Sequence, residues 1–202
     1  MRCPGVLLTL VLGLVATGCG RGDDTVTRGG GLCGDPGLVG TMSGLVPDPV
    51  DGCGVKAAVR LTSVHGVRLS QPATLDCPTA RTLGAWVEQS ARPAVGRMGG
   101  GLSGLRVAAH YVCRTRNHQS GARISEHGKG RAIDIAALKL RDGSEISVLH
   151  DWGRGPKGRV LRRVHRDACG PFGTVLGPGS DGFHQDHMHF DTARHRGGPY
   201  CR

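Results

Sequence analysis

Aromatic residues are scarce in this chain. Phe, Trp and Tyr make up 3% of its 202 residues, whereas Gly occurs 35 times. Proteins that bind single-stranded nucleic acid stack the bases on aromatic side chains. The scarcity, together with the scattering of the basic residues, therefore argues against a nucleic acid partner even though the net charge is +10. It also predicts a small, aliphatic and loop-rich core that needs covalent links.

Several motifs are absent as well. No Cys-x-x-Cys pair occurs, which argues against a Cys-rich zinc site. No Gly-x-Ser-x-Gly motif surrounds Ser125, so we interpret that residue as part of its own loop and not as a nucleophile. No internal repeat is visible. The most apolar run, residues 6–15, is too short to span a membrane.

That short apolar run has the features of an export signal. Arg2 precedes it, and the segment Ala16-Thr17-Gly18-Cys19 follows it. This ending resembles a bacterial lipoprotein cleavage site, which makes residues 1–19 a signal peptide and Cys19 the lipidated residue. Ala16 stands where Leu is most common, so a plain secretory signal is the alternative. We expect an exported lipoprotein, anchored in the membrane and facing the periplasm or the cell surface, with residues 20–32 as a flexible tether.

Export determines how the cysteines are interpreted. Cys3 leaves with the signal and Cys19 takes the lipid. An even number of cysteines in an oxidising compartment predicts disulfides, here up to three, and fifteen pairings remain open. The positive charge of such an exported protein suggests anionic wall polymers or lipid headgroups as neighbours. The six candidate disulfide residues are Cys33, Cys53, Cys77, Cys113, Cys169 and Cys201.

The hydrophobic pattern predicts one α+β domain over residues 33–202, with a small antiparallel sheet and flanking helices. Residues 33–52 read as an irregular lead-in, and residues 55–69 as strand-like with a turn at Gly66. A helix over residues 78–97 is expected to be capped by Thr79 and ended or kinked by Pro93. A second, amphipathic helix covers residues 157–169. Strands are expected at 105–111, 132–140, 145–149, 172–176 and 187–191, with Asp142-Gly143 as a hairpin turn.

Two stretches carry candidate metal ligands. His127 and Asp134 lie seven residues apart, at the two ends of a Gly-containing segment that leads into a buried strand. An imidazole and a carboxylate in this arrangement can converge on one zinc ion, which needs at least three protein ligands. The only dense source of a third ligand is residues 184–191, where three His alternate with two Asp. For His127 and Asp134 alone, a glycine turn with a solvated His is the simpler interpretation.

The second stretch has the spacing of a strand. His187, His189 and Asp191 then share one face, whereas Met188 and Phe190 share the other. This placement turns two imidazoles toward the same site. We interpret His184 as a loop residue, with a supporting role next to the ligands as the alternative.

The pattern Ser-x-His-x-x-Gly-x-Ala-x-Asp, followed by His-x-His, resembles the signature of a zinc superfamily that includes lysostaphin, the D-Ala-D-Ala peptidases and the N-terminal domain of hedgehog. Residues 53–202 more closely resemble the bacterial extensin-like C-terminal domain family. The matching segments are 53–55, 111–117, 125–127, 132–134, 172–179 and 200–201. The resemblance spans residues 53–202, about three quarters of the chain, which lacks the Pro-rich repeats of a plant extensin.

The resemblance implies a ligand set and catalytic roles. His127, Asp134 and His189 would hold Zn²⁺ and leave one position open for water, as catalytic zinc sites do. His187 is favoured as the group that assists the water, with Asp186 as the base or as a partner that orients His187. One of Arg114 and Arg116 would face a substrate carboxylate, with a solvated basic loop as the alternative.

The expected function is zinc-dependent hydrolysis of a peptide or amide bond in peptidoglycan, by a monomer whose partner is the wall peptide. The competing expectation belongs to another class: a zinc-stabilised module that binds the wall without turnover, as hedgehog-type members of the superfamily suggest.

Overall fold

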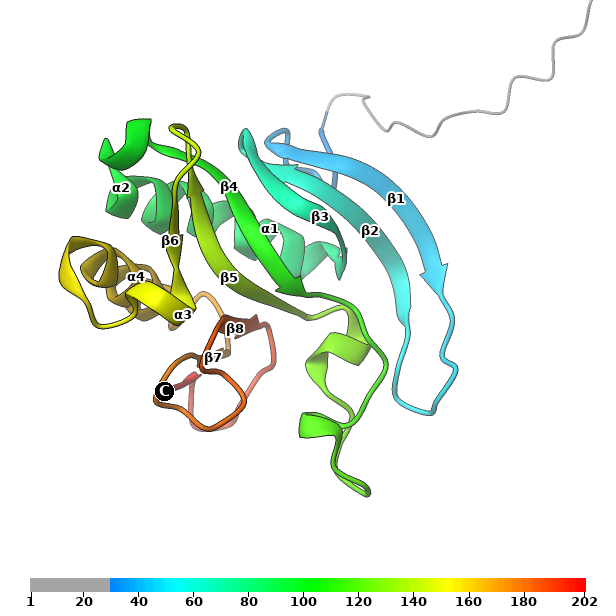
Figure 1. Ribbon diagram of the computed structural model, residues 1–202. Helices are drawn as coiled ribbons and strands as arrows, with labels where there is room; N and C mark the ends of the chain where they lie inside the picture. The colour runs from blue at the N-terminus through cyan, green and yellow to red at the C-terminus, as the bar shows by residue number, and fades with distance from the viewer. Residues whose placement is uncertain (1–29) are drawn as a thin grey trace, which may run out of the picture.

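The computed structural model describes residues 30–202, which form one nine-stranded mixed sheet with helices packed against it (Figure 1). The strand order is β1-β2-β3-β4-β5-β8-β7-β9, and β6 also pairs with β5. The strands are β1 (Leu38–Val46), β2 (Val55–Val64), β3 (Val67–Asp76), β4 (Leu102–Ala109), β5 (Ala132–Leu140), β6 (Glu145–Ser147), β7 (Thr174–Leu176), β8 (Met188–Asp191) and β9 (Tyr200–Cys201).

The small antiparallel sheet that the pattern predicted is in fact a nine-stranded mixed sheet. The pairs β3–β4 and β7–β9 run parallel, and the N-terminal lead-in contains a nine-residue strand, β1, where irregular chain was expected. This strand escapes detection because it lies at the edge of the sheet and is mostly exposed, so its residues show no alternation of buried and exposed positions. The α+β class, the hairpin between β5 and β6, and the limits of β5 are as expected.

The first helical segment comprises α1 (Cys77–Trp86), the π-helical turn η1 (Val87–Ala91) and α2 (Arg92–Val95). Its cap is Asp76 and not Thr79, because the Asp76 carboxylate accepts a hydrogen bond of 2.8 Å from the Thr79 amide. Pro93 does not end the helix. A π-helical turn directly precedes Pro93, and in it the Arg92 amide donates a hydrogen bond to the Val87 carbonyl. The irregularity expected at Pro93 therefore takes the form of a π bulge.

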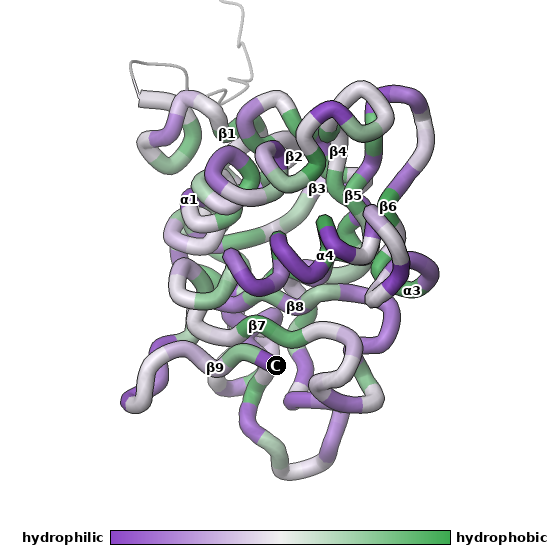
Figure 2. The backbone as a smooth tube through the Cα atoms, turned by 90° about the vertical axis from the view of Figure 1, so that its left-hand side faces the viewer, coloured by the Kyte–Doolittle hydropathy of each residue, from purple (hydrophilic) through white to green (hydrophobic). Residues whose placement is uncertain are grey.

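The remaining helices are short except for one. They are η2 (Met98–Gly100), η3 (Arg116–His118), η4 (Glu126–Lys129), α3 (Val148–Asp151) and α4 (Gly155–Ala168). The strand expected over 145–149 ends at Ser147, because α3 begins at the next residue. The amphipathic α4 is confirmed: its buried side includes Val160, Leu161, Val164 and Ala168, and its hydrophilic side faces the viewer in Figure 2.

The core joins both long helices to the C-terminal part of the sheet. The Trp86 indole donates a hydrogen bond of 2.9 Å to the Val164 carbonyl of α4, and its ring meets Phe190 of β8 edge to face. Phe172 stacks on Phe190 with a distance of 5.1 Å between the ring centroids. These few aromatic side chains therefore hold β8 in a fixed position, as aromatic pairs do in compact cores.

Three disulfides confirm the prediction from the six cysteines. They join Cys33 to Cys77, Cys53 to Cys113, and Cys169 to Cys201. Such a set indicates an oxidising, exported location. The predicted signal peptide, Cys19 and most of the tether lie outside the described residues.

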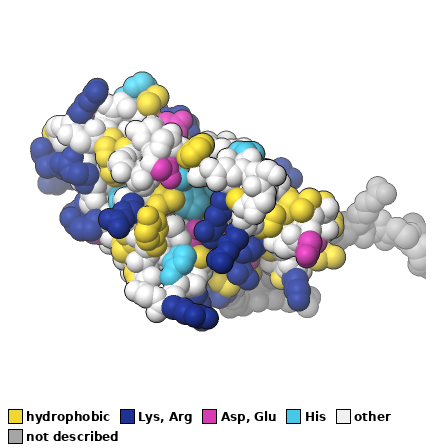
Figure 3. Space-filling model, turned by 90° about the horizontal axis from the view of Figure 1, so that it is seen from below, with side chains coloured by type: hydrophobic (Ala, Val, Ile, Leu, Met, Phe, Trp, Pro, Cys, Tyr) yellow, Lys and Arg dark blue, Asp and Glu magenta, His cyan; other side chains and the backbone are white. Residues whose placement is uncertain are grey.

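No helix within residues 30–202 is long and apolar enough to cross a membrane. On the underside of the molecule, Lys and Arg side chains gather in several groups close to exposed His side chains (Figure 3).

Candidate metal centre

Two neighbouring strands and one short helix bring the predicted ligands together. Strands β5 and β8 pair antiparallel, and their register places Asp134 directly opposite His189. His127 lies on η4, which ends at Gly130 in a left-handed conformation just before β5 begins. A Cβ at Gly130 would meet the Val55 side chain at 2.7 Å, so glycine is needed here for space as well as for conformation.

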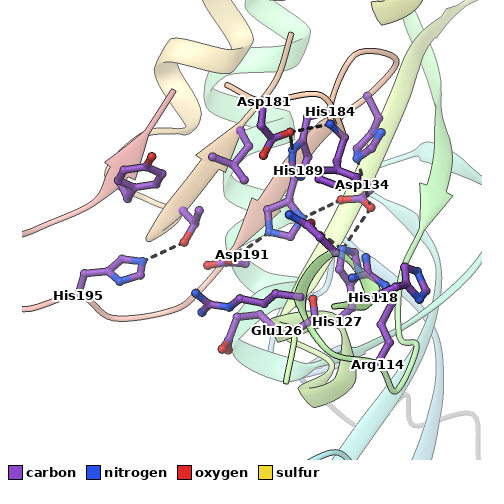
Figure 4. Close-up of a pocket in the computed structure, with 18 residues that line it drawn as sticks. Arg114, His118, Glu126, His127, Asp134, Asp181, His184, His189, Asp191 and His195 are labelled. Atoms are coloured by element: carbon purple, nitrogen blue, oxygen red, sulfur yellow. Dashed lines mark hydrogen bonds and ion pairs between the residues drawn. The ribbon is translucent and has the colours of Figure 1, made fainter. Parts of the chain in front are cut away.

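The three side chains converge on one point, as Figure 4 shows. His127 Nε2 lies 3.2 Å from Asp134 Oδ2, and His189 Nδ1 lies 2.9 Å from Asp134 Oδ1. The two ring nitrogens are 3.2 Å apart. One ligand atom from each residue therefore lies within 4.8 Å of the others, and all three residues are buried.

The outer nitrogens of both rings have acceptors. His127 Nδ1 donates to the His110 carbonyl at 2.7 Å, and His189 Nε2 donates to Asp191 Oδ2 at 3.0 Å. Each of these contacts fixes a proton on the outer nitrogen, because a carbonyl or a carboxylate only accepts. In the neutral rings, the inner nitrogens then direct lone pairs toward each other and toward the Asp134 carboxylate.

Such a cluster of lone pairs and a carboxylate requires a cation at its centre. In the metal-free protein a proton meets this need. Burial lowers the pKa of His189, but its hydrogen bonds with Asp134 and Asp191 outweigh burial and raise that pKa to about 9. Burial likewise raises the pKa of Asp134, but its hydrogen bonds with His127 and His189 hold that pKa well below the usual range.

A divalent metal ion meets the same need more fully. Two imidazoles and one carboxylate suit zinc and several other first-row divalent ions. The outer hydrogen bonds to a backbone carbonyl and a carboxylate are those that commonly orient metal-bound His. The geometry thus shows a buried group that can hold a metal ion, with the identity of the ion left to experiment.

The two candidate catalytic residues lie beside this group. His187 directly precedes β8, and its Nε2 is 3.6 Å from Asp134 Oδ2. Its Nδ1 donates to Asp186 Oδ1 at 2.8 Å. The His187 side chain is 15% exposed and the Asp186 side chain 65%, so the pair links the buried ligands to solvent. Strand β8 begins one residue later than expected, yet His187 still faces the ligands.

A second His–Asp pair was not foreseen from the sequence. His184 is buried, and its Nδ1 donates to Asp181 Oδ1 at 2.6 Å. Its ring centre lies 5.1 Å from that of His187 and 5.7 Å from that of His189. His184 therefore lies in a loop, as expected, and this loop places its ring in the wall of the site. Burial lowers the pKa of His184, and the hydrogen bond to Asp181 offsets this only partly.

An open pocket of about 370 Å³ connects the ligands to solvent. Arg114 and Arg116 both line it. They lie on the loop that follows β4, where the Cys53–Cys113 disulfide fixes its first residues. Arg114 donates to the Thr115 carbonyl at 3.2 Å, whereas Arg116 is exposed.

Sequence analysis missed several members of the pocket. The sequence pattern placed Asp191 on the same strand face as His189, but the role of Asp191 in orienting His189 was not predicted. Asp181, Phe183, His195 and Tyr200 also line the pocket. Asp181, Phe183 and His195 lie in irregular loops and Tyr200 lies in the two-residue strand β9, so no periodic pattern predicts them.

Comparison with known proteins gives one match. No curated protein and no solved structure matches the chain. A family model described as the C-terminus of extensin-like protein covers residues 42–202, which is most of the chain and includes every residue of the candidate site. The chain therefore belongs to the extensin-like C-terminal family.

Proposed function

We propose that this protein is an exported, metal-dependent hydrolase that cleaves a peptide or amide bond in peptidoglycan. The observation that carries the proposal is the buried group of His127, Asp134 and His189, which opens into a pocket beside the His187–Asp186 pair. The similarity of the two motifs to the zinc superfamily of lysostaphin and the D-Ala-D-Ala peptidases supports the same class of reaction.

The three ligand residues have one task, which is to hold the ion, preferably zinc. Zinc bound at this place would supply Lewis acidity, which polarises a carbonyl group and lowers the pKa of a nearby water. His110 and Asp191 support the ligands by fixing the protons on the outer ring nitrogens.

His187 is the residue placed to move a proton. Its Nδ1 carries the proton donated to Asp186, so its Nε2 is free to accept a proton from the attacking water. The same nitrogen can then return the proton to the leaving amine. Asp186 stabilises the protonated ring, and its exposure leaves open its alternative role as the base itself.

A second candidate function rests on the position of the same residue. His187 Nε2 is 3.6 Å from Asp134 Oδ2, which is close enough for a small rotation to make His187 a fourth ligand. A zinc ion with four protein ligands is a structural site. The protein would then be a metal-stabilised module that binds the wall without cleaving it.

Digestion of purified cell-wall sacculi tests the proposal. The metal-loaded protein is incubated with sacculi, and soluble fragments are identified by mass spectrometry. We expect fragments with new amino and carboxyl ends, and none after removal of the metal by a chelator. Re-addition of zinc should restore release.

The same samples separate the two functions. If the metal-loaded protein sediments with sacculi but releases nothing from several wall types, the binding module is the correct assignment. Release that continues unchanged after chelation would contradict a metal-dependent reaction.

A further inference from the structure

A second, larger cleft of about 1070 Å³ adjoins the metal pocket. The two share Arg116, Glu126 and His195 in their walls, so a ligand can pass from one into the other without leaving the surface. Five basic and two acidic side chains line the cleft. The basic residues are Arg116, Arg123, Lys129, Arg131 and Arg194, and the acidic ones are Asp76 and Glu126.

Two fixed segments contribute the free arginines of the cleft. In the first, the Arg116 amide donates to the Arg123 carbonyl at 2.9 Å, next to a bridge between Thr115 and Ile124, so both arginines belong to one closed loop. In the second, the Thr192 amide donates to the Arg131 carbonyl at 3.0 Å and anchors the segment that carries Arg194.

The charges fall into two classes. Lys129 pairs with Glu126 at 2.7 Å, and Arg131 lies 3.6 Å from Asp76, so these four side chains largely neutralise one another. Arg116, Arg123 and Arg194 take part in no ion pair within residues 30–202, and all three are exposed. The cleft therefore presents three free guanidinium groups on two segments.

We infer that this cleft binds an extended acidic peptide through its separate carboxylates, and thereby positions the next part of that peptide at the metal group. The inference deepens the proposed function and rests on it only for what happens at the metal. Guanidinium groups bind carboxylates with two parallel hydrogen bonds, which gives position as well as attraction.

The arrangement favours spaced carboxylates over a continuous polyanion. Because two of its five basic side chains are paired with Asp76 and Glu126, the cleft has only three positive charges in excess, which suits a few separated carboxylates better than a dense run of phosphates. The three free arginines lie on two separate segments, residues 116–123 and residue 194, which suits a chain whose negative charges are separated by neutral units.

Peptide binding to the metal-free protein tests the inference independently of turnover. The probe is a fluorescent (Glu-Gly)₅ peptide with an amidated end, followed by anisotropy at low and at physiological ionic strength. We expect saturable binding that weakens with salt. The uncharged (Gln-Gly)₅ peptide should bind far more weakly.

Two double variants locate the binding. Arg123→Ala/Arg194→Ala should raise the Kd on the order of tenfold, because each exposed ion pair accounts for up to about fivefold in affinity. Neither residue lines the metal pocket, so the metal content of this variant should equal that of the unmodified protein. The matched control is Arg159→Ala/Arg162→Ala, which removes the same charge from the exposed side of α4 and should leave the Kd unchanged.

Equal losses in the two double variants would show that only net charge attracts the peptide, and would overturn the inference. Tighter binding of polyphosphate than of (Glu-Gly)₅ at equal charge would assign the cleft to a phosphate polymer instead. If the sacculus digestion fails while peptide binding is intact, the proposed hydrolysis is wrong and peptide binding by the cleft stands. An Arg123→Ala/Arg194→Ala variant whose Kd equals that of the unmodified protein, with digestion intact, would overturn the binding role of the cleft and leave the reaction.

Discussion

Strand β8 has two buried faces of opposite chemistry. Met188 and Phe190 on one face are completely buried among apolar side chains, and His189 and Asp191 on the other are 7% and 4% exposed. Burial of an apolar side chain stabilises the fold by itself, by about 1.5–3 kcal/mol for a large one. Burial of an imidazole or a carboxylate costs free energy unless its partners are complete.

The difference shows which face serves stability and which serves function. The polar face has hydrogen bonds on its outer side but needs a cation on its inner side. Apolar residues of similar volume would hold β5 and β8 together equally well. The chain instead keeps a polar group whose arrangement is useful only when a cation occupies it.

The largest expected effect is on the polar face. His127→Ala, Asp134→Ala and His189→Ala should each reduce bound metal from about one ion per chain to a trace, because a site with two protein ligands holds zinc poorly. Elemental analysis after dialysis measures this. His150→Ala, which removes an exposed His outside the pocket, is the matched control. A ligand variant that keeps the full metal content would contradict the assignment of that residue.

The next effect separates catalysis from metal binding. His187→Ala should keep the metal and lower the release of wall fragments about 100- to 10,000-fold, the usual contribution of a general acid–base group. Asp186→Asn should have a similar effect if Asp186 is the base, and a milder one if it only orients His187. Fragment release and metal content are measured for both variants. Loss of metal in His187→Ala would identify His187 as a fourth ligand and favour the wall-binding module.

The sequence predicted both the polar and the apolar face of β8, because a strand places alternate residues on opposite sides. The sequence also predicted that residues 125–135 and 184–191 lie close together, because the second stretch is the only dense source of further His and Asp ligands for His127 and Asp134. The register that sets Asp134 opposite His189 follows from tertiary pairing between distant segments, which no local pattern contains.

Other features of the fold were beyond a local interpretation. The β1 strand is exposed along most of its length, so its hydrophobic signal is weak. The pairing of Cys33 with Cys77, and of the other four cysteines, depends on distances in the folded chain. The cleft of Arg116, Arg123 and Arg194 combines the loop after β4 with the segment after β8, and apart from Arg116 the sequence showed these arginines only as scattered charges.

A substitution on the apolar face of β8 should lower the stability of the fold and not its metal content. Phe190→Ala should lower the free energy of unfolding by about 3–5 kcal/mol, because it leaves a cavity between Trp86 and Phe172. Denaturant unfolding in the presence of a chelator measures this loss without any contribution from metal. Phe183→Ala, at a residue that is 56% exposed, should change stability by less than about 0.5 kcal/mol. Equal losses in the two variants would contradict the packing described for β8.

The smallest effect concerns pH and again separates the two faces. The pKa of His189 rises from 6.5 to about 9 on folding, so its contribution is complete below pH 6.5 and is lost as the pH rises through about 9. The pKa values of Asp134 and Asp191 fall below 3.8 on folding, so their contributions are present above that pH and are lost in acid. The metal-free protein should therefore lose about 1–3 kcal/mol of stability between pH 6.5 and pH 9.

Bound metal should remove this alkaline decline, because His189 then binds the ion as a neutral imidazole and holds no extra proton at any pH in that range. Urea unfolding of the metal-free and metal-loaded protein across the same pH range makes the comparison. Phe190→Ala should lower the whole curve of the metal-free protein without changing its slope, since the apolar face of β8 carries no titrating group. A metal-free curve that stays flat up to pH 9 would show that the central cation of the cluster is not a proton on His189.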